Sequence, residues 1–214
     1  MEKTKILPLY KKRFNELSGG EKQRVIIERN LKIYKASFQS AIGTIYYLWV
    51  RSDRRKEADD EIGGQVKLSY LGNRKGLFEN YVEKLKENSF MKDLFPVQDK
   101  KSAEIENHIL DYLSGKVKNI KLDTYFLFGT NFEKKVWNTV VSIPYGKTLS
   151  YKELAEKTGC PLAWRAVGTA LGHNPVMLVV PCHRIIRSDG SIGNFGGGVK
   201  VKEFLLNLEG LNRY

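Results

Sequence analysis

Cysteine is scarce in this sequence. Among 214 residues there are two, Cys160 and Cys182, which allow one disulfide at most. No apolar N-terminal segment typical of a secretory signal is present, so we expect a reducing intracellular compartment. Histidine is scarce as well, with three residues, and neither a C-x-x-C nor an H-x-x-x-H spacing occurs. We therefore expect no metal site.

Long apolar runs and acidic residues are also few. The longest apolar neighbourhood, residues 42–50, ends at a basic run, well short of the roughly 20 apolar residues of a membrane span. Lysine and arginine number 36 against 24 aspartates and glutamates, and the resulting charge of +12 attracts polyanions. Nucleic acid is the favoured partner and a membrane is not expected, although a lysine-rich solvated surface explains the charge equally well.

One motif near the N-terminus is typical of a different protein class. Residues 17–24, Leu-Ser-Gly-Gly-Glu-Lys-Gln-Arg, resemble the signature loop of ABC transporter ATPases. That loop completes a nucleotide site only opposite a P-loop of pattern G-x-x-x-x-G-K-[ST], and the sequence contains none. We interpret the motif as a polar turn and expect no nucleotide cofactor.

The first half of the chain, residues 1–125, is predicted to be an α+β domain. The β-branched and aromatic stretch 37–50 and the alternation over 66–70 predict strands of a small antiparallel sheet, with the basic run 51–56 as a hairpin loop. Two further sets of apolar residues follow helical spacing. These are Leu77, Tyr81, Val82 and Leu85, then Ile105, Ile109, Leu110 and Leu113.

The second half, residues 126–214, is predicted to be mostly helical. Thr130 with Glu133, and Ser150 with Glu153, form capping boxes that begin two helices. A third helix, about 162–171, follows a tight turn. Two short helices joined in this way are typical of a DNA-binding helix-turn-helix, although an ordinary helical hairpin has the same pattern. An apolar, strand-like run then precedes Pro181.

Cys182 and His183 are the residues most suggestive of chemistry. A thiolate is a strong nucleophile, and a neighbouring base or cation promotes its formation near neutral pH. Adjacent side chains in a strand point to opposite faces, so the pair must lie in a turn or helix start, or communicate through water. A buried structural cysteine explains this pair equally well.

A longer pattern surrounds this pair. It closely resembles the O6-alkylguanine-DNA alkyltransferases over about residues 131–210, whereas the N-terminal half matches that family only in general character. The matching segments are Ser150-Tyr151, Arg165-Ala166-Val167-Gly168, Asn174-Pro175, Pro181-Cys182-His183-Arg184, Gly193-Asn194-Phe195-Gly196-Gly197-Gly198, Lys202-Glu203-Phe204-Leu205-Leu206 and Glu209-Gly210.

The resemblance implies direct DNA repair without a cofactor. Cys182 would take an alkyl group, typically methyl, from the O6 atom of guanine in DNA, irreversibly and once per molecule, as a methylated-DNA–[protein]-cysteine S-methyltransferase. O4-alkylthymine is a further substrate that the resemblance allows. His183 would take the thiol proton through a water, and Glu209 would orient and charge His183.

The resemblance also implies how DNA is held. Double-stranded DNA would bind through its minor groove to the helix that carries Ala166, Gly168 and Thr169. Arg165 would fill the gap left by the flipped nucleotide, and Tyr151 would rotate the phosphate and donate a proton toward the leaving guanine. The family further implies a monomer, in the cytoplasm or at the nucleoid, with a ribonuclease H-like N-terminal domain.

The base pocket implied by the resemblance is lined by Phe195, Gly196, Gly197 and Ile185, while Asn174 supports the turn before the reactive cysteine. Many relatives carry serine or threonine where this sequence has Gly196. Only a backbone amide is left there to donate to O6, which predicts a wider pocket or weaker discrimination between alkyl groups. A zinc site found in some relatives is not expected, because no cysteine precedes Cys160.

Two other functions compete with alkyl transfer. A non-catalytic protein of the same shape would bind the lesion and recruit other factors, but relatives of that kind lack the reactive cysteine. A cysteine hydrolase would need an oxyanion hole and turnover, and would not need a basic helix-turn-helix.

Overall fold

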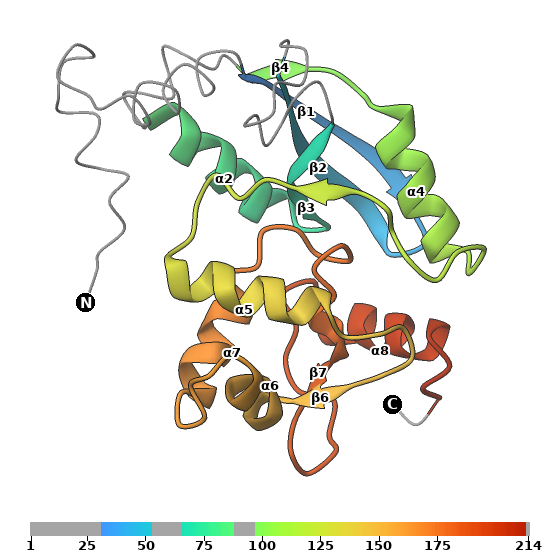
Figure 1. Cartoon of the computed structure of the whole chain (residues 1–214). Helices are drawn as coiled ribbons and strands as arrows, with labels where there is room; N and C mark the ends of the chain where they lie inside the picture. The colour runs from blue at the N-terminus through green and yellow to red at the C-terminus, as the bar shows by residue number, and fades with distance from the viewer. Residues whose placement is uncertain (1–30, 53–65, 88–96, 213–214) are drawn as a thin grey trace, which may run out of the picture.

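The computed structural model describes residues 31–52, 66–87 and 97–212. The motif at residues 17–24 lies outside these ranges, as does most of the basic run predicted to be a hairpin loop. In the part that is described, the elements form a five-stranded sheet with two helices, followed by a mostly helical half (Figure 1). No helix of this described part is long and apolar enough to cross a membrane.

The sheet has the strand order β4-β1-β2-β3-β5. Its central strands β1, β2 and β3 are antiparallel, whereas β4 runs parallel to β1 and β5 runs parallel to β3. The prediction of an antiparallel sheet therefore holds for the centre and is wrong at both edges. The strands are β1 (Leu31–Ser40), β2 (Gly43–Ser52), β3 (Lys67–Gly72), β4 (Val97–Asp99) and β5 (Asp123–Thr124).

The stretch 37–50 is not one strand but parts of two. The chain turns at residues 41–42. The backbone of Gly43 has a φ of +92°, a conformation that residues with a Cβ atom rarely adopt. Ala41 and Ile42 are not typical turn residues, which explains why the sequence pattern hides this hairpin. Arg51, predicted to lie in a hairpin loop, is instead part of β2.

Each face of the sheet is covered by a helix, as alternating strand residues require. Helix α2 (Lys75–Glu87) packs Phe78, Val82 and Leu85 against one face, and α4 (Ala103–Leu113) contributes to the core on the other. Both predicted helices are confirmed. Leu77 and Leu110, which helped to define their spacing, are nevertheless exposed.

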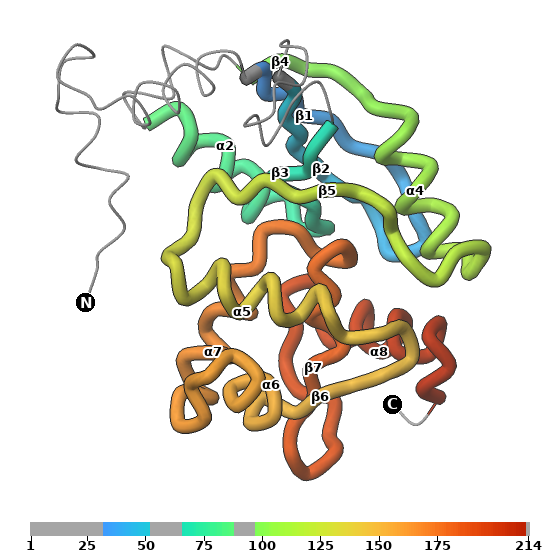
Figure 2. The backbone as a smooth tube through the Cα atoms, in the orientation of Figure 1, coloured from blue at the N-terminus to red at the C-terminus, as the bar shows by residue number. Residues whose placement is uncertain are grey.

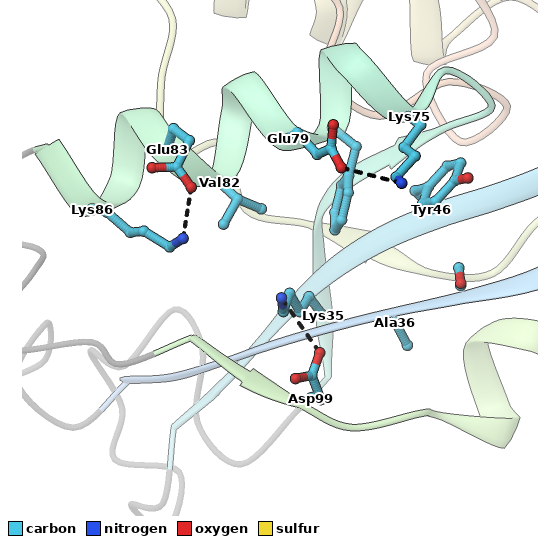
Figure 3. Close-up of a pocket in the computed structure, with 11 residues that line it drawn as sticks. Lys35, Ala36, Tyr46, Lys75, Glu79, Val82, Glu83, Lys86 and Asp99 are labelled. Carbon is cyan, nitrogen blue, oxygen red and sulfur yellow. Dashed lines mark hydrogen bonds and ion pairs between the residues drawn. The ribbon is translucent and has the colours of Figure 1, made fainter.

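A groove on the α2 side is lined by three lysines and three carboxylates (Figure 3). All six groups form ion pairs with one another, so their formal charges cancel. This groove therefore offers no surplus charge to an anion, unlike the pocket described below. The pairs are Lys35 with Asp99, Lys75 with Glu79, and Lys86 with Glu83.

The C-terminal half contains five helical segments and a short parallel strand pair. Both predicted capping boxes are present, each with its two reciprocal hydrogen bonds. The third predicted helix begins two residues later than expected, at Trp164, and Leu162 lies in the preceding turn with 94% of its surface exposed. The elements are α5 (Asn131–Val141), β6 (Leu149–Ser150), α6 (Tyr151–Lys157), α7 (Trp164–Gly172), the 3-10 turn η3 (Cys182–Arg184), β7 (Ile185–Ile186) and α8 (Val199–Leu208).

The segment after α7 joins the two halves, rising from the helical half to β3 (Figure 2). The Leu71 N–H donates to the Pro175 carbonyl, and the Leu71 carbonyl accepts a hydrogen bond from the Met177 N–H. The prediction that the run 176–180 is strand-like is wrong. The run makes only isolated bridges and turns back on itself, with Leu178 at a φ of +72°. Because every residue of the run except Val179 is buried, its apolar composition resembles that of a buried strand.

Candidate active site

Cys182 and His183 lie in the η3 turn and not in a strand, which is one of the arrangements that the sequence allows. The Cys182 side chain is half-buried, and its Sγ accepts a hydrogen bond of 3.0 Å from Nδ2 of Asn174. The same amide donates to the Val180 carbonyl and accepts from the Val176 N–H. Asn174 thus joins the residues before and within the turn by hydrogen bonds, and it also touches the thiol.

His183 is fully buried and pairs with Glu209, which lies directly after α8. Nε2 of His183 is 2.9 Å from Oε1 of Glu209, and Nδ1 has no partner in the described part of the chain. Burial lowers the pKa of His183, although the Glu209 carboxylate raises it again in part. The imidazole is therefore held neutral, with Nδ1 available as a proton acceptor when Nε2 carries the hydrogen.

Glu209 is held by two residues to which the sequence assigned no role. Arg184 donates to both carboxylate oxygens from Nε, at 3.0 and 3.1 Å, and Tyr112 donates its hydroxyl hydrogen at 2.6 Å. Burial raises the pKa of Glu209, but hydrogen bonds from His183, Arg184 and Tyr112 outweigh it and lower the pKa to about 2. The carboxylate is thus charged at any physiological pH.

A buried cation completes the surroundings of the thiol. Lys202 of α8 is 0% exposed, and its Nζ donates to the carbonyls of Ile185 and Asn194. Burial lowers the pKa of Lys202 to about 8, while the Cys182 thiolate raises it. Burial likewise raises the pKa of the Cys182 thiol, against the hydrogen bond from Asn174 and the charge of Lys202, which lower it.

The glycine-rich segment 193–198 lies beside this cluster. The Phe195 ring stands edge-on to the His183 imidazole at 6.4 Å, and Asn73, just after β3, donates to the Gly197 carbonyl. A Cβ on Gly197 would lie 2.7 Å from the Phe195 ring, which would have to shift, whereas a Cβ on Gly196 would meet nothing within 4 Å. Ile185, predicted to line the pocket, is fully buried in the core.

A second feature, an open pocket, lies between α6, α7 and the segment after β7. Three of its residues are basic and none is acidic. The Arg165 guanidinium lies 4.8 Å from the centre of the Trp164 ring, and burial together with the Cys182 thiolate raises the pKa of Tyr151. The pocket residues are Tyr151, Lys152, Trp164, Arg165, Gly168, Thr169, Arg187, Ser188 and Asn194.

The predicted site residues thus form two neighbouring groups. Direct hydrogen bonds join Asn174 to Cys182 and His183 to Glu209, and Tyr151 belongs to the open pocket together with Arg165, Gly168 and Thr169. Ala166 is exposed on α7 outside the pocket residues. In the part of the chain that the structure describes, no group of three or more histidine, cysteine or acidic side chains could hold a metal ion.

Comparison with known proteins identifies the family. A family model described as the DNA binding domain of 6-O-methylguanine DNA methyltransferase matches residues 131–211. The methylated-DNA–protein-cysteine methyltransferase of Methanosarcina acetivorans is 36% identical over 180 residues, which cover 83% of this chain and 99% of that protein. The chain belongs to this methyltransferase family.

Other members of the family match over different lengths. The inducible methylated-DNA–protein-cysteine methyltransferase of Bacillus subtilis is 39% identical, over 66% of this chain and 78% of that protein. The Methanosarcina barkeri protein is 47% identical, but the match spans only 46% of this chain and 61% of that protein. The identity is therefore higher over the shorter match.

Solved structures support the same fold. Mycobacterium tuberculosis OGT, in a structure described as a complex with DNA, has a TM-score of 0.61 and 27% identity, covering 83% of this chain and 92% of that one. The O6-methylguanine-DNA methyltransferase of Pyrococcus kodakaraensis has a TM-score of 0.57 at 24% identity, which concerns the fold alone. The mixed α+β architecture is therefore that of known alkyltransferases.

Proposed function

We propose that the chain repairs O6-alkylguanine in DNA by transferring the alkyl group to Sγ of Cys182, once per molecule. The observation that carries this proposal is a thiol held by Asn174, next to a buried Lys202 and a neutral imidazole whose Nδ1 lacks a partner among the described residues. The match with the Methanosarcina acetivorans methyltransferase covers 99% of that protein and 83% of this chain.

The chemical step forms one bond and breaks one. The Cys182 thiol loses its proton to Nδ1 of His183, and because no hydrogen bond in the described chain joins the two residues, we infer a bridging water. The thiolate attacks the alkyl carbon in line, the C–O6 bond breaks, and its electron pair goes to guanine. Tyr151, whose raised pKa keeps it protonated, donates a proton toward the leaving base.

DNA is proposed to bind across α6 and α7 as a helix-turn-helix, with α7 in the minor groove of a duplex. The basic pocket supplies Lys152, Arg165 and Arg187 for phosphate contacts. A flipped nucleotide is required, because an O6 group inside the base stack cannot meet the thiol in line. All the groups invoked come from one chain, so a monomer suffices.

The N-terminal half, residues 1–125, is proposed to be a ribonuclease H-like domain. Three antiparallel strands, with a fourth lying parallel beside the first, support that assignment. The core cluster that contains Tyr34, Tyr47 and Tyr112 also contains residues of the C-terminal half, such as Trp137 and Val167. We therefore expect the two domains to unfold together.

The test is the intact mass of the protein after mixing with a duplex that carries one O6-methylguanine, followed by peptide mapping. We expect one methyl group on Cys182 in stoichiometric yield, and none in a Cys182→Ser control. Tight binding to the lesion without any mass change would replace this proposal with a non-catalytic lesion-binding protein. Repeated turnover without a stable adduct would favour a hydrolase.

Arg165→Ala is expected to slow repair in duplex DNA by about 10-fold or more, because an unfilled gap leaves the unstacked duplex uncompensated by a few kcal/mol. Reaction with free O6-benzylguanine needs no flipping and should change less than about 2-fold. Single-turnover rates with both substrates measure the difference. Lys157→Ala, a basic residue at the end of α6 outside the pocket residues, is the control. Equal slowing of both reactions would refute the flipping role of Arg165.

Gly196→Ser is expected to leave the fold intact and to change alkyl-group preference. The added Cβ meets nothing within 4 Å, so the free energy of unfolding should change by less than about 0.5 kcal/mol. One new hydroxyl donor toward O6 should alter the ratio of methyl to benzyl transfer rates by about 2- to 10-fold. Gly197→Ser is the contrasting variant, because its Cβ collides with Phe195. An unchanged rate ratio would show that a hydroxyl at this position does not contribute to discrimination between methyl and benzyl groups.

A further inference from the structure

Tyr112 reaches the catalytic pair from the other half of the molecule. It lies near the end of α4, is 1% exposed, and donates its hydroxyl hydrogen to Oε1 of Glu209 at 2.6 Å. The same hydroxyl oxygen is 3.3 Å from Nε2 of His183. A single buried phenol from the sheet half therefore touches both members of the pair.

Only one arrangement of hydrogens satisfies these three groups. A charged carboxylate is an acceptor only, so the Tyr112 O–H must point to Glu209. The distance of 2.9 Å between Nε2 of His183 and Oε1 of Glu209 likewise requires a hydrogen on Nε2. The Tyr112 oxygen then presents its lone pair to that N–H. This leaves Nδ1 of His183 as the acceptor, and Nδ1 is the buried atom without a partner in the described residues.

The charged and titratable groups around this cluster come from several elements. Arg184 of η3 donates to Glu209, Lys202 of α8 lies near His183, and Gly146 donates its backbone N–H to Oε2 of Glu209. Tyr145 packs edge-on against the Tyr112 ring at 6.3 Å, and Lys118 lies over the Tyr145 ring. Among these, Tyr112 is the neutral donor that contacts both His183 and Glu209.

We propose that Tyr112 is a positioning residue for alkyl transfer. It fixes the orientation of Glu209 and the hydrogen on Nε2 of His183. Its hydrogen bond to Glu209 also reduces the extent to which the carboxylate stabilises the imidazolium form of His183. Its effect passes through His183, which must be neutral to accept the thiol proton. The sheet half thereby contributes directly to the chemistry of the helical half. The effect on rate rests on the proposed alkyl transfer, whereas the effect on His183 does not.

The sign of the effect of Tyr112→Phe follows from these contacts. Without the phenol hydrogen, the negative charge of the Glu209 carboxylate is less neutralised by hydrogen bonding, so it stabilises the imidazolium form of His183 more strongly. The pKa of His183 should rise by about half a unit to one unit, the equivalent of one neutral hydrogen bond. Imidazolium cannot accept the thiol proton, so the ratio of the variant rate to the wild-type rate should fall as the pH falls from 8 to 5.

The first experiment compares single-turnover alkyl transfer by the full chain and by Tyr112→Phe across this pH range. The matched control is Tyr145→Phe, which also loses one hydroxyl, here one bonded to the Leu208 carbonyl, and touches neither His183 nor Glu209 by a hydrogen bond. We expect a pH-dependent rate ratio for Tyr112→Phe and a constant ratio for Tyr145→Phe. A constant ratio for Tyr112→Phe, or the same pH dependence in both variants, would reduce Tyr112 to a structural role.

A second measurement separates this inference from the proposed function. The sequence contains three histidines, so nitrogen-15 NMR of the free protein can follow the His183 imidazole without any DNA. We expect its ring nitrogen shifts to move toward imidazolium in Tyr112→Phe and to stay unchanged in Tyr145→Phe. If wild-type protein transfers no alkyl group but this difference persists, alkyl transfer fails as the function, whereas the effect of Tyr112 on the protonation of His183 stands. Identical His183 shifts in wild-type and Tyr112→Phe protein would overturn the inference.

Discussion

Glu209→Gln is expected to lower the free energy of unfolding by about 3 to 5 kcal/mol, because it leaves the buried Arg184 guanidinium without its counter-charge. It should also slow alkyl transfer by about 100-fold or more, since His183 loses the carboxylate that stabilises its protonated form. In the wild type, Arg184 makes three hydrogen bonds to Glu209 and one to the Ile143 carbonyl. The glutamine amide can replace part of this geometry but none of the charge.

The same carboxylate predicts the pH dependence of stability. Its pKa is held at about 2, below the ordinary value of 4.5. Below 4.5 the unfolded chain binds a proton that the folded chain refuses, so this contribution is fully present above pH 4.5 and is lost as the pH falls toward 2. Glu209→Gln should lack this acid-dependent part of the unfolding free energy.

Denaturant unfolding at pH 7 and pH 4, together with single-turnover transfer at pH 7, tests these expectations. Glu203→Gln is the matched control, because Glu203 lies on α8 with an exposed side chain. It should leave stability and rate nearly unchanged. A Glu209→Gln protein as stable as this control would show that the buried pair adds no net stability.

Local signals in the sequence predicted most of the helices correctly. Thr130 with Glu133 and Ser150 with Glu153 satisfy one another within four residues, so the capping boxes could be read without any tertiary information. Local geometry alone also indicates that Cys182 and His183 lie in a turn or helix start, or else communicate through water, and the pair does lie in a turn. Such inferences succeed because every atom that they involve is close in the chain.

The inferences that failed depend on distant contacts. The run 176–180 has the composition of a buried strand, but bridges to β3 and the turn around Leu178 decide its course. The edge strands β4 and β5 contain three and two residues, too few for any alternation to be visible.

The sequence pattern also missed the residues that tune the site. Glu209, read by itself, resembles a solvated charge near a helix end, and only the family resemblance identifies it as a site residue. Tyr112 is separated from Glu209 by 97 positions in the chain, and no spacing rule connects them. Lys202 lies on the buried face of α8, where an apolar residue is the usual expectation. A lysine inside an apolar stripe is the one signal that could have identified it.

Lys202→Met is expected to reduce the reactivity of Cys182 by about 10-fold at pH 7, because removing a nearby cation raises the pKa of the thiol further and less thiolate forms.

Lys202 also affects stability. Its pKa of about 8, compared with an ordinary 10.5, shows that the buried ammonium costs the folded state free energy. Between these values the unfolded chain holds a proton that the folded chain has released, so wild-type stability should rise by about 1 kcal/mol from pH 7 to pH 9. Lys202→Met should lack this rise, whereas the exposed Lys200→Met should retain it. Thiol titration with a chromogenic disulfide, and denaturant unfolding at both pH values, measure the two effects. Unchanged thiol reactivity in Lys202→Met would mean that hydrogen bonding from Asn174 alone governs the thiolate.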